Sequence, residues 1–200
     1  MDISTLLPDD DVSRVIKFVA AINSLKKEIR YSQVKNKKWD SVADHSRRLT
    51  MLAFLLAQDK NRWLDVNKVI KIALVHDLAE AMTGDIDVSL VYNWEITTQE
   101  KNQKEILQIK ILLQTLPQDL ADEIYSSRED YEFQKSNEAS FVKALDKMEA
   151  IMHYIQEDFE WSFQPFIRQH WLKEVQSSGK LDDLYEKIKI LIDKFMEKYE

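Results

Sequence analysis

The chain of 200 residues contains no cysteine, only two glycines and only three prolines. Without cysteine, it cannot form a disulfide, use a thiolate nucleophile or offer a sulfur ligand to a metal ion. An extended β-sheet architecture would need more turn residues than this chain supplies. The abundant leucine, isoleucine, alanine, lysine, glutamate and glutamine instead predict helices joined by short loops.

Long apolar runs and an excess of positive charge are also missing from the chain. No stretch approaches the roughly 18 apolar residues of a membrane span, and MDISTLLPDD at the amino terminus lacks the features of a signal peptide. The net charge of −7 repels polyanions, which argues against a nucleic-acid partner. We therefore expect a soluble, cytoplasmic protein that contacts no membrane and acts on a small molecule.

The length and the hydrophobic pattern predict one helical domain. Two hundred residues, 44% of them hydrophobic, are enough to bury one substantial core. Apolar residues three and four positions apart predict helices over about 12–25, 41–56, 65–82 and 97–115, a shorter helix after Pro117, and helices over about 137–156, 163–176 and 180–199. We predict a single all-α domain over 1–200, in which C-terminal helices of about 163–199 pack on a core of about 12–158.

Local signals mark where several of these helices begin and end. The acidic run LPDDD precedes the first helix and complements its dipole. Ser41 and Asp44 have the spacing of a capping box at the start of the second helix. Gly84 stands where the third helix is expected to stop.

The stretch HDLAEAMTGDIDV at 76–88 places five ionisable residues at the end of an otherwise apolar helix. When the apolar stripe of this helix is continued in steps of three and four, it reaches His76, Asp77 and Glu80. These three side chains are therefore predicted to point inward. A buried ionised carboxylate costs several kcal/mol unless a cation pairs with it, so the pattern calls for a strong positive charge nearby.

Two other predicted helices offer one metal-capable side chain each. His45 lies on the apolar stripe of the second helix, and Asp146 lies at the edge of the apolar face of the helix over 137–156. A single histidine on an apolar face also fits a core residue without a ligand. With the His76 and Asp77 pair added, imidazole and carboxylate donors without sulfur suit a divalent Mn, Fe, Co, Ni or Zn ion.

A lone histidine, a His-Asp doublet and a distant aspartate resemble the HD superfamily of metal-dependent phosphohydrolases, which has a helical-bundle fold. SVADHS, ALVHDLAEAMTGDI and FVKALDKME are similar to its branch of bacterial 5′-deoxynucleotidases and their eukaryotic relatives. The similarity covers about 12–158, and the pattern HDxxExxxGDI is far more specific than a bare His-Asp pair.

This resemblance implies a set of site residues. Four side chains would hold one divalent metal ion (Mn, Co, Fe, Ni, Mg or Zn): His45, His76, Asp77 and Asp146. Glu80 would orient the attacking water, and Asp85 would serve the leaving group. The chemistry is consistent, because a metal can lower the pKa of bound water from 15.7 to about 7, and a carboxyl group can protonate a leaving oxygen.

The same branch carries an arginine and an aromatic residue fifteen positions before the first metal-binding histidine, where this chain has Arg30 and Tyr31. The resemblance implies that Arg30 binds the phosphate and that Tyr31 packs against the sugar, where crowding at the 2′ position disfavours ribonucleotides. Lys143 is similar to a lysine of the branch and would contact the substrate. In the alternative reading, Arg30 and Tyr31 are the solvated end of the first helix, and Lys143 extends along a core helix.

Several remaining residues are expected to have no part in catalysis. Arg47 and Arg48 would be solvated or paired with acids. His153 and His170 have no partner at ligand spacing and would be structural or exposed. The aromatic-rich stretch at 154–171 would pack on the last helices or form a subunit contact.

The function that these features favour is a metal-dependent phosphomonoester hydrolase, namely a 5′-nucleotidase that releases phosphate from (deoxy)ribonucleoside 5′-monophosphates. One alternative is an HD-type hydrolase of another phosphate ester, such as a cyclic nucleotide, a deoxynucleoside triphosphate or guanosine tetraphosphate. Another is a non-catalytic nucleotide or metal sensor, although a sensor would be expected to have lost a ligand or an acid. Because relatives in this family are commonly dimers, we also expect a homodimer.

Overall fold

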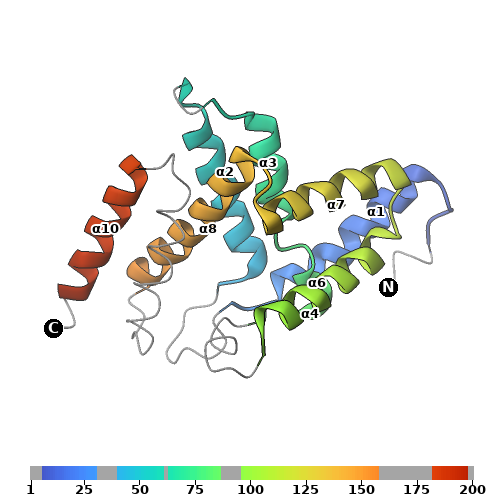
Figure 1. Ribbon diagram of the computed structural model, residues 1–200. Coiled ribbons are helices and arrows are strands. Elements are labelled where there is room, and N and C mark those ends of the chain that lie inside the picture. Colours follow the sequence, from blue (N-terminus) through green and yellow to red (C-terminus); the bar gives the residue numbers. More distant parts are fainter. Residues whose placement is uncertain (1–5, 31–39, 61–62, 87–95, 158–181, 198–200) are drawn as a thin grey trace.

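Figure 1 shows the computed structural model of the chain. The structure describes residues 6–30, 40–60, 63–86, 96–157 and 182–197. Within these ranges the chain is helical and forms no strand, and one isolated bridge joins Ile29 to Ser41. The prediction of an all-α fold is confirmed. None of the helices in these ranges combines the length and the apolar character needed to cross a membrane.

The helical elements occur where the sequence predicts them. In chain order they are α1 (Asp11–Ala21), the 3₁₀ helix η2 (Ile22–Lys26), α2 (Val42–Ala57), α3 (Val66–Val75), α4 (Glu80–Thr83), α6 (Thr98–Leu113), α7 (Gln118–Phe133), α8 (Asn137–Gln156) and α10 (Asp182–Glu197). The helix that follows Pro117 was expected to be shorter than its predecessor, which is wrong, because α6 and α7 each have 16 residues. The helix predicted over 163–176 lies outside the described residues.

The expected helix over 65–82 is interrupted, which corrects the prediction of one continuous helix. After α3 ends, the amide of Leu78 bonds to the Val75 carbonyl (3.2 Å) and the amide of Glu80 to the Asp77 carbonyl (3.0 Å). These are the tighter bonds of a 3₁₀-type turn. The reason lies in a side chain, because His76 Nδ1 sits 2.9 Å from the Ala73 carbonyl, which would accept the amide of Asp77 in a continuous helix.

The predicted helix boundaries have clear chemical causes. Asp10 caps α1 by accepting a hydrogen bond from the amide of Ser13 (2.9 Å). Ser41 caps α2 by accepting one from the amide of Asp44 (3.1 Å). Gly84 ends α4 with φ +71°, a backbone conformation that residues with a β-carbon rarely adopt.

Two clusters of buried apolar side chains form the core. One joins α2, α3, α7, α8 and α10 around Leu49, Ile72 and Leu145. The other joins α1, η2, α6 and the start of α7 around Phe18 and Ile109. In Figure 1, α10 lies at one end of the molecule and α1 with α6 at the other, with α2, α3 and α8 between them. The turn between α3 and α4 connects the two clusters and carries His76 and Asp77 of the candidate site.

Candidate active site

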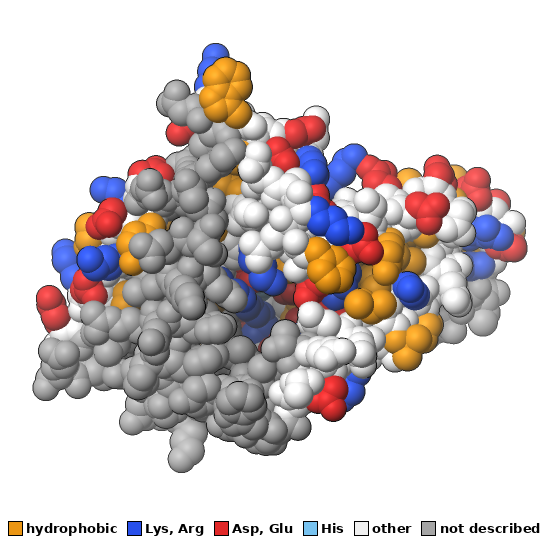
Figure 2. Space-filling model, in the orientation of Figure 1, with side chains coloured by type: hydrophobic (Ala, Val, Ile, Leu, Met, Phe, Trp, Pro, Cys, Tyr) orange, Lys and Arg blue, Asp and Glu red, His pale blue; other side chains and the backbone are white. Residues whose placement is uncertain are grey.

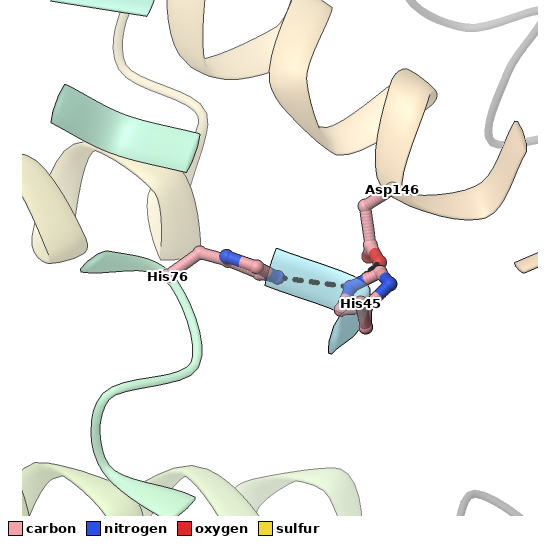
Figure 3. Close-up of side chains that lie close together, drawn as sticks. All are labelled: His45, His76 and Asp146. Carbon is pink, nitrogen blue, oxygen red and sulfur yellow. Dashed lines mark hydrogen bonds and ion pairs between the residues drawn. The ribbon is translucent and has the colours of Figure 1, made fainter. Parts of the chain in front are cut away.

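His45, His76 and Asp146 meet in the interior although they come from three separate elements (Figure 3). One ligand atom of each lies within 4.8 Å of the others, and all three residues are buried. His45 Nε2 lies 3.3 Å from His76 Nε2 and 3.1 Å from Asp146 Oδ1. α2, the end of α3 and α8 therefore present donor atoms to one point, which is a candidate metal site.

Asp77 reaches the same point. Its Oδ2 lies 2.9 Å from His76 Nε2 and 3.7 Å from His45 Nε2. The side chain of Asp77 is 20% exposed, whereas that of His45 is fully buried, so Asp77 stands on the more open side of the cluster. The structure thus brings together all four side chains that the sequence singled out as metal ligands.

The two carboxylates of this cluster stay ionised in spite of their burial. Burial raises the pKa of Asp146, but the charges of Lys147 and His45 outweigh it and hold this pKa well below its usual range. The pKa of Asp77 is lowered as well, because His76 and His45 outweigh the effect of burial. Two carboxylates and two imidazoles without sulfur form a donor set that fits a divalent cation of the Mn-to-Zn series.

The outer nitrogen of His45 is held from behind by a chain of charged side chains. His45 Nδ1 lies 2.5 Å from Glu149 Oε2, and Glu149 also accepts a hydrogen bond from Arg48 Nε. Arg48 Nη2 in turn donates to both carboxylate oxygens of Asp40 at 2.9 Å. The expectation that Arg48 pairs with acids is confirmed, whereas no role was predicted for Glu149 or Asp40.

Tyr131 supports the other side of the cluster and was not predicted. Its hydroxyl donates to Asp146 Oδ2 (2.8 Å), and its ring packs edge-on against His76 with 5.1 Å between centroids. Lys143 Nζ lies 4.2 Å from the centroid of the Tyr131 ring, and Lys147 Nζ lies 3.1 Å from Asp146 Oδ2. The ring of Tyr131 therefore lies between Lys143 and the candidate ligands His76 and Asp146.

Glu80, the first residue of α4, is the buried acid beside this cluster. It is 6% exposed, and its Oε2 has no hydrogen-bond partner among the described residues. Burial, followed by the charges of Asp77 and Asp85, raises the pKa of Glu80 well above its usual value. Asp85 itself is half-buried just after Gly84. Both predicted acids thus belong to one electrostatic group with Asp77.

Lys101 on α6 is a cation near the site that was not predicted. Its Nζ donates to the carbonyl of Ile86 (3.4 Å) and lies 3.7 Å from Glu105 Oε1. Burial lowers the pKa of Lys101, but the charges of Glu105, Glu80 and Asp85 outweigh this effect and raise it. Lys101 therefore acts electrostatically on both predicted acids.

Arg30 lies against the chain of charges behind His45 rather than in solvent. Its side chain is 12% exposed, and its Nη1 lies 3.5 Å from Glu149 Oε2 and 3.9 Å from Asp40 Oδ2. The alternative reading of Arg30 as a solvated helix end is therefore wrong. His153 is buried 3.7 Å from the same Asp40 carboxylate, as expected of a structural histidine. Tyr31 falls outside the described residues.

A groove opens next to Asp85 between α4 and α6. It encloses about 520 Å³, and Met82, Ile86 and Leu107 contribute to its lining. Small-molecule sites commonly enclose about 300–1,000 Å³, so the groove has a suitable size for a ligand.

On the face drawn in Figure 2, acidic and basic side chains gather at a hollow near the middle of the molecule.

Comparisons with known proteins place this geometry in context. A family model for the HD domain matches residues 22–188. The 5′-deoxynucleotidase HDDC2 of Mus musculus is 36% identical over 175 residues, which cover 86% of this chain and 77% of that protein. The human 5′-deoxynucleotidase HDDC2 is 35% identical over 175 residues, with 86% and 75% covered. The crystal structure of a predicted metal-dependent phosphohydrolase from Magnetospirillum magnetotacticum MS-1 has a TM-score of 0.77 at 22% identity, covers 94% of this chain and 96% of that one, and shows likeness of fold.

Proposed function

The chain belongs to the HD domain family, and from this premise we propose that it is a metal-dependent 5′-nucleotidase. It releases phosphate from nucleoside 5′-monophosphates, with deoxyribonucleotides as the preferred substrates. Relatives named 5′-deoxynucleotidase support this proposal, since two of them are 36% and 35% identical over 86% of the chain. Hydrolysis of another phosphate ester and non-catalytic sensing are not favoured.

The observation that carries the proposal is the convergence of four donor side chains beside an acid. His45 Nε2 lies within 3.7 Å of His76, Asp77 and Asp146 donor atoms. Glu80 adds a carboxyl oxygen that is buried yet accepts no hydrogen bond within the described part of the chain. A buried, unsatisfied oxygen beside a cluster of metal donors is suited to a water molecule that is about to react.

In this proposal His45, His76, Asp77 and Asp146 hold one divalent metal ion. Such an ion would supply the positive charge that balances the buried carboxylates and would make a water molecule acidic enough to react at neutral pH. The chain itself contributes a rigid set of four donors and a shell of partners around them. Tyr131 fixes one oxygen of Asp146, and Glu149 fixes the ring of His45.

The remaining residues divide the handling of protons and of the phosphate. Glu80 orients the attacking water through a hydrogen bond to Oε2 and takes up the proton that the water loses as its oxygen bonds to phosphorus. Asp85 holds the proton that the 5′ oxygen takes up when its bond to phosphorus breaks, so that the products are a nucleoside and inorganic phosphate. Arg30 binds the phosphate, because a guanidinium can donate two parallel hydrogen bonds to it. Tyr31 packs against the sugar, and Lys143 contacts the substrate from α8.

Three finer points belong to the same proposal. The native metal is one of Mn, Co, Fe, Ni, Mg or Zn, because the donor set suits several of these ions. The protein is a homodimer, which light scattering after size-exclusion chromatography measures directly. It acts in the cytoplasm, a reducing compartment with which a chain without cysteine is compatible.

The experiment that tests the proposal measures phosphate release from a panel of deoxy- and ribonucleoside 5′-monophosphates. The metal-stripped chain is assayed in EDTA and then with Mn, Co, Mg or Zn, next to Asp77→Ala and next to Glu123→Gln, which alters an exposed ion pair with Lys71. Metal-dependent release that disappears only in Asp77→Ala supports the proposal. A folded, metal-loaded protein that releases phosphate from none of these substrates contradicts it. The ratio of deoxy- to ribonucleotide rates in Tyr31→Ala tests the proposed sugar contact.

A further inference from the structure

Glu149 stands behind the metal-ligand candidate His45 and belongs to the same helix as Asp146. It follows Asp146 by three residues, so that α8 presents both carboxylates on one face. It is 4% exposed, and its Oε2 lies 2.5 Å from Nδ1 of His45. The other ring nitrogen, Nε2, faces His76 and Asp146. One imidazole therefore joins the candidate metal site to a buried carboxylate.

The Glu149 carboxylate is itself fixed on both oxygens. Arg48 Nε donates to Oε1, while Oε2 faces both His45 Nδ1 and, at 3.5 Å, Arg30 Nη1. Arg48 is tied to Asp40 by two hydrogen bonds of 2.9 Å. These contacts leave the Glu149 carboxylate little freedom to rotate. A neutral imidazole carries its hydrogen on one nitrogen only, and the carboxylate accepts that hydrogen at Nδ1.

We propose that Glu149 is a positioning residue that makes His45 a metal ligand through Nε2. By accepting the Nδ1 hydrogen, it selects the tautomer whose Nε2 lone pair points at the site, and it fixes the ring orientation. The inference rests on the proposed function for the role of His45 as a ligand. The linked side chains Asp40, Arg48 and Glu149 then do more than form ion pairs. They lead to the ring of His45, whose Nε2 is the proposed ligand atom.

Replacement by glutamine isolates this role. Glu149→Gln keeps the shape of the side chain and one acceptor oxygen, but its amide nitrogen can only donate. If the amide NH2 group faces Arg48, two hydrogen-bond donors meet. If it faces His45 Nδ1, it favours the His45 tautomer with hydrogen on Nε2. Both arrangements weaken the ligand, and Glu149→Ala removes the acceptor altogether.

The first test is the dissociation constant of the metal-stripped chain for Mn²⁺ and Co²⁺, measured by titration calorimetry. We expect an affinity loss of roughly 10–100-fold in Glu149→Gln and at least as much in Glu149→Ala, the range typical of outer partners of metal-bound histidines. The matched control is Asp130→Asn, which removes a buried carboxylate whose partners, Lys68 and Ser136, lie outside the site. Its affinity should stay within twofold of the parent. Folded Glu149 variants that bind both ions within twofold of the parent would overturn the proposal, as would a parent chain that binds neither ion.

The second test needs no variant and therefore does not depend on how well one folds. The chain has four histidines, so long-range proton–nitrogen correlation spectra of the Zn²⁺-loaded parent are simple. We expect His45 to carry hydrogen on Nδ1 and to coordinate through Nε2. Coordination through Nδ1, or hydrogen on Nε2, would overturn the proposal.

A third readout separates positioning from a general loss of structure. At saturating metal, kcat of Glu149→Gln should recover towards the parent value, because the defect lies in affinity for the ion. If affinity falls as expected while neither the parent nor any variant hydrolyses a nucleotide, the inference stands and the proposed function fails. If nucleotides are hydrolysed and the affinity of the Glu149 variants is unchanged, the function stands and the inference fails.

Discussion

The candidate site has two sides, each with a buried glutamate, that are chemically opposite. On the anchored side, defined by His45, Glu149, Arg48 and Asp40, each carboxylate is held by a cation. On the acid side, defined by Glu80 and Asp85, the Oε2 of Glu80 accepts no hydrogen bond from any residue that the structure describes. Glu149 and Glu80 are 4% and 6% exposed, so burial does not distinguish them.

Their partners do distinguish them. Burial raises the pKa of both carboxyl groups, but His45, Arg30 and Arg48 outweigh it at Glu149 and lower the pKa there. At Glu80 the neighbours Asp77 and Asp85 add to the effect of burial and raise the pKa. A difference in partners, not a difference in burial, therefore lowers the pKa of one carboxyl group and leaves the pKa of the other raised. We therefore expect substitutions on the two sides to affect different measured quantities.

The largest effect should follow removal of a metal ligand. Asp146→Ala deletes a donor that α8 brings to the site, and we expect phosphate release to fall by roughly 10³-fold or more, since a catalytic metal supplies several kcal/mol of stabilisation. EDTA should reduce the activity of the parent chain by a similar factor. Added metal should restore activity in the parent but not in Asp146→Ala. An Asp146→Ala protein that keeps parental activity would show that phosphate release needs no metal ion held by Asp146.

Glu80→Gln should produce the next largest loss, and in a different quantity. We expect kcat to fall by about 10²–10⁴-fold, the usual contribution of a positioned acid or base. The dissociation constant for Mn²⁺ should remain within twofold of the parent, because Glu80 is not among the proposed ligands. A large loss of metal affinity in Glu80→Gln would show that the acid side also contributes to metal binding, so that the two sides would not control different quantities. Glu123→Gln on the surface of α7 is the matched control.

Arg30→Gln should raise the KM of the nucleotide and the dissociation constant of inorganic phosphate by about 10–100-fold. A hydrogen bond to a charged group contributes about 1.5–3 kcal/mol, which corresponds to this range. Arg14→Gln, which alters an exposed ion pair with Asp9, should leave both constants unchanged. A fall in kcat at unchanged KM would instead assign Arg30 to the transition state.

The smallest effect concerns stability of the metal-free chain. Because the pKa of Glu80 is higher in the folded than in the unfolded state, its contribution to stability is present below the unfolded pKa and is lost as the pH rises through the folded pKa. We expect Glu80→Gln to be more stable than the parent at high pH, because the variant has no carboxyl group to ionise at this buried position. This gain should shrink as the pH falls towards about 5 in denaturant titrations. A gain that does not change with pH would show that Glu80 is not the group responsible.

The sequence predicts most of the candidate site because helical spacing and the His-Asp doublet are local signals. His45, His76 and Asp146 lie on predicted helices, and the structure joins them at one point. Glu149 had an available signal, since it follows Asp146 by one helical turn on the face already identified. The prediction of one domain over 1–200 stays a prediction.

Other site residues gave no local signal. Lys101 belongs to a helix crowded with charges, and nothing in that pattern separates it from its solvated neighbours. Tyr131 is 15 residues away from Asp146 in sequence and meets it only because α7 packs on α8. The break after Val75 also escaped prediction, because it depends on a hydrogen bond between a side chain and the backbone.

That break has a consequence for anyone who would transplant the site. Neighbouring residues in a regular α-helix point about 100° apart, so a His-Asp pair within one would aim its two side chains at different places. Here His76 Nε2 and Asp77 Oδ2 come within 2.9 Å of each other where the α-helix gives way to a 3₁₀-type turn. A designed bundle of ideal helices that copied the four ligands alone would separate two of them. The irregular turn is therefore as necessary to copy as the side chains it carries.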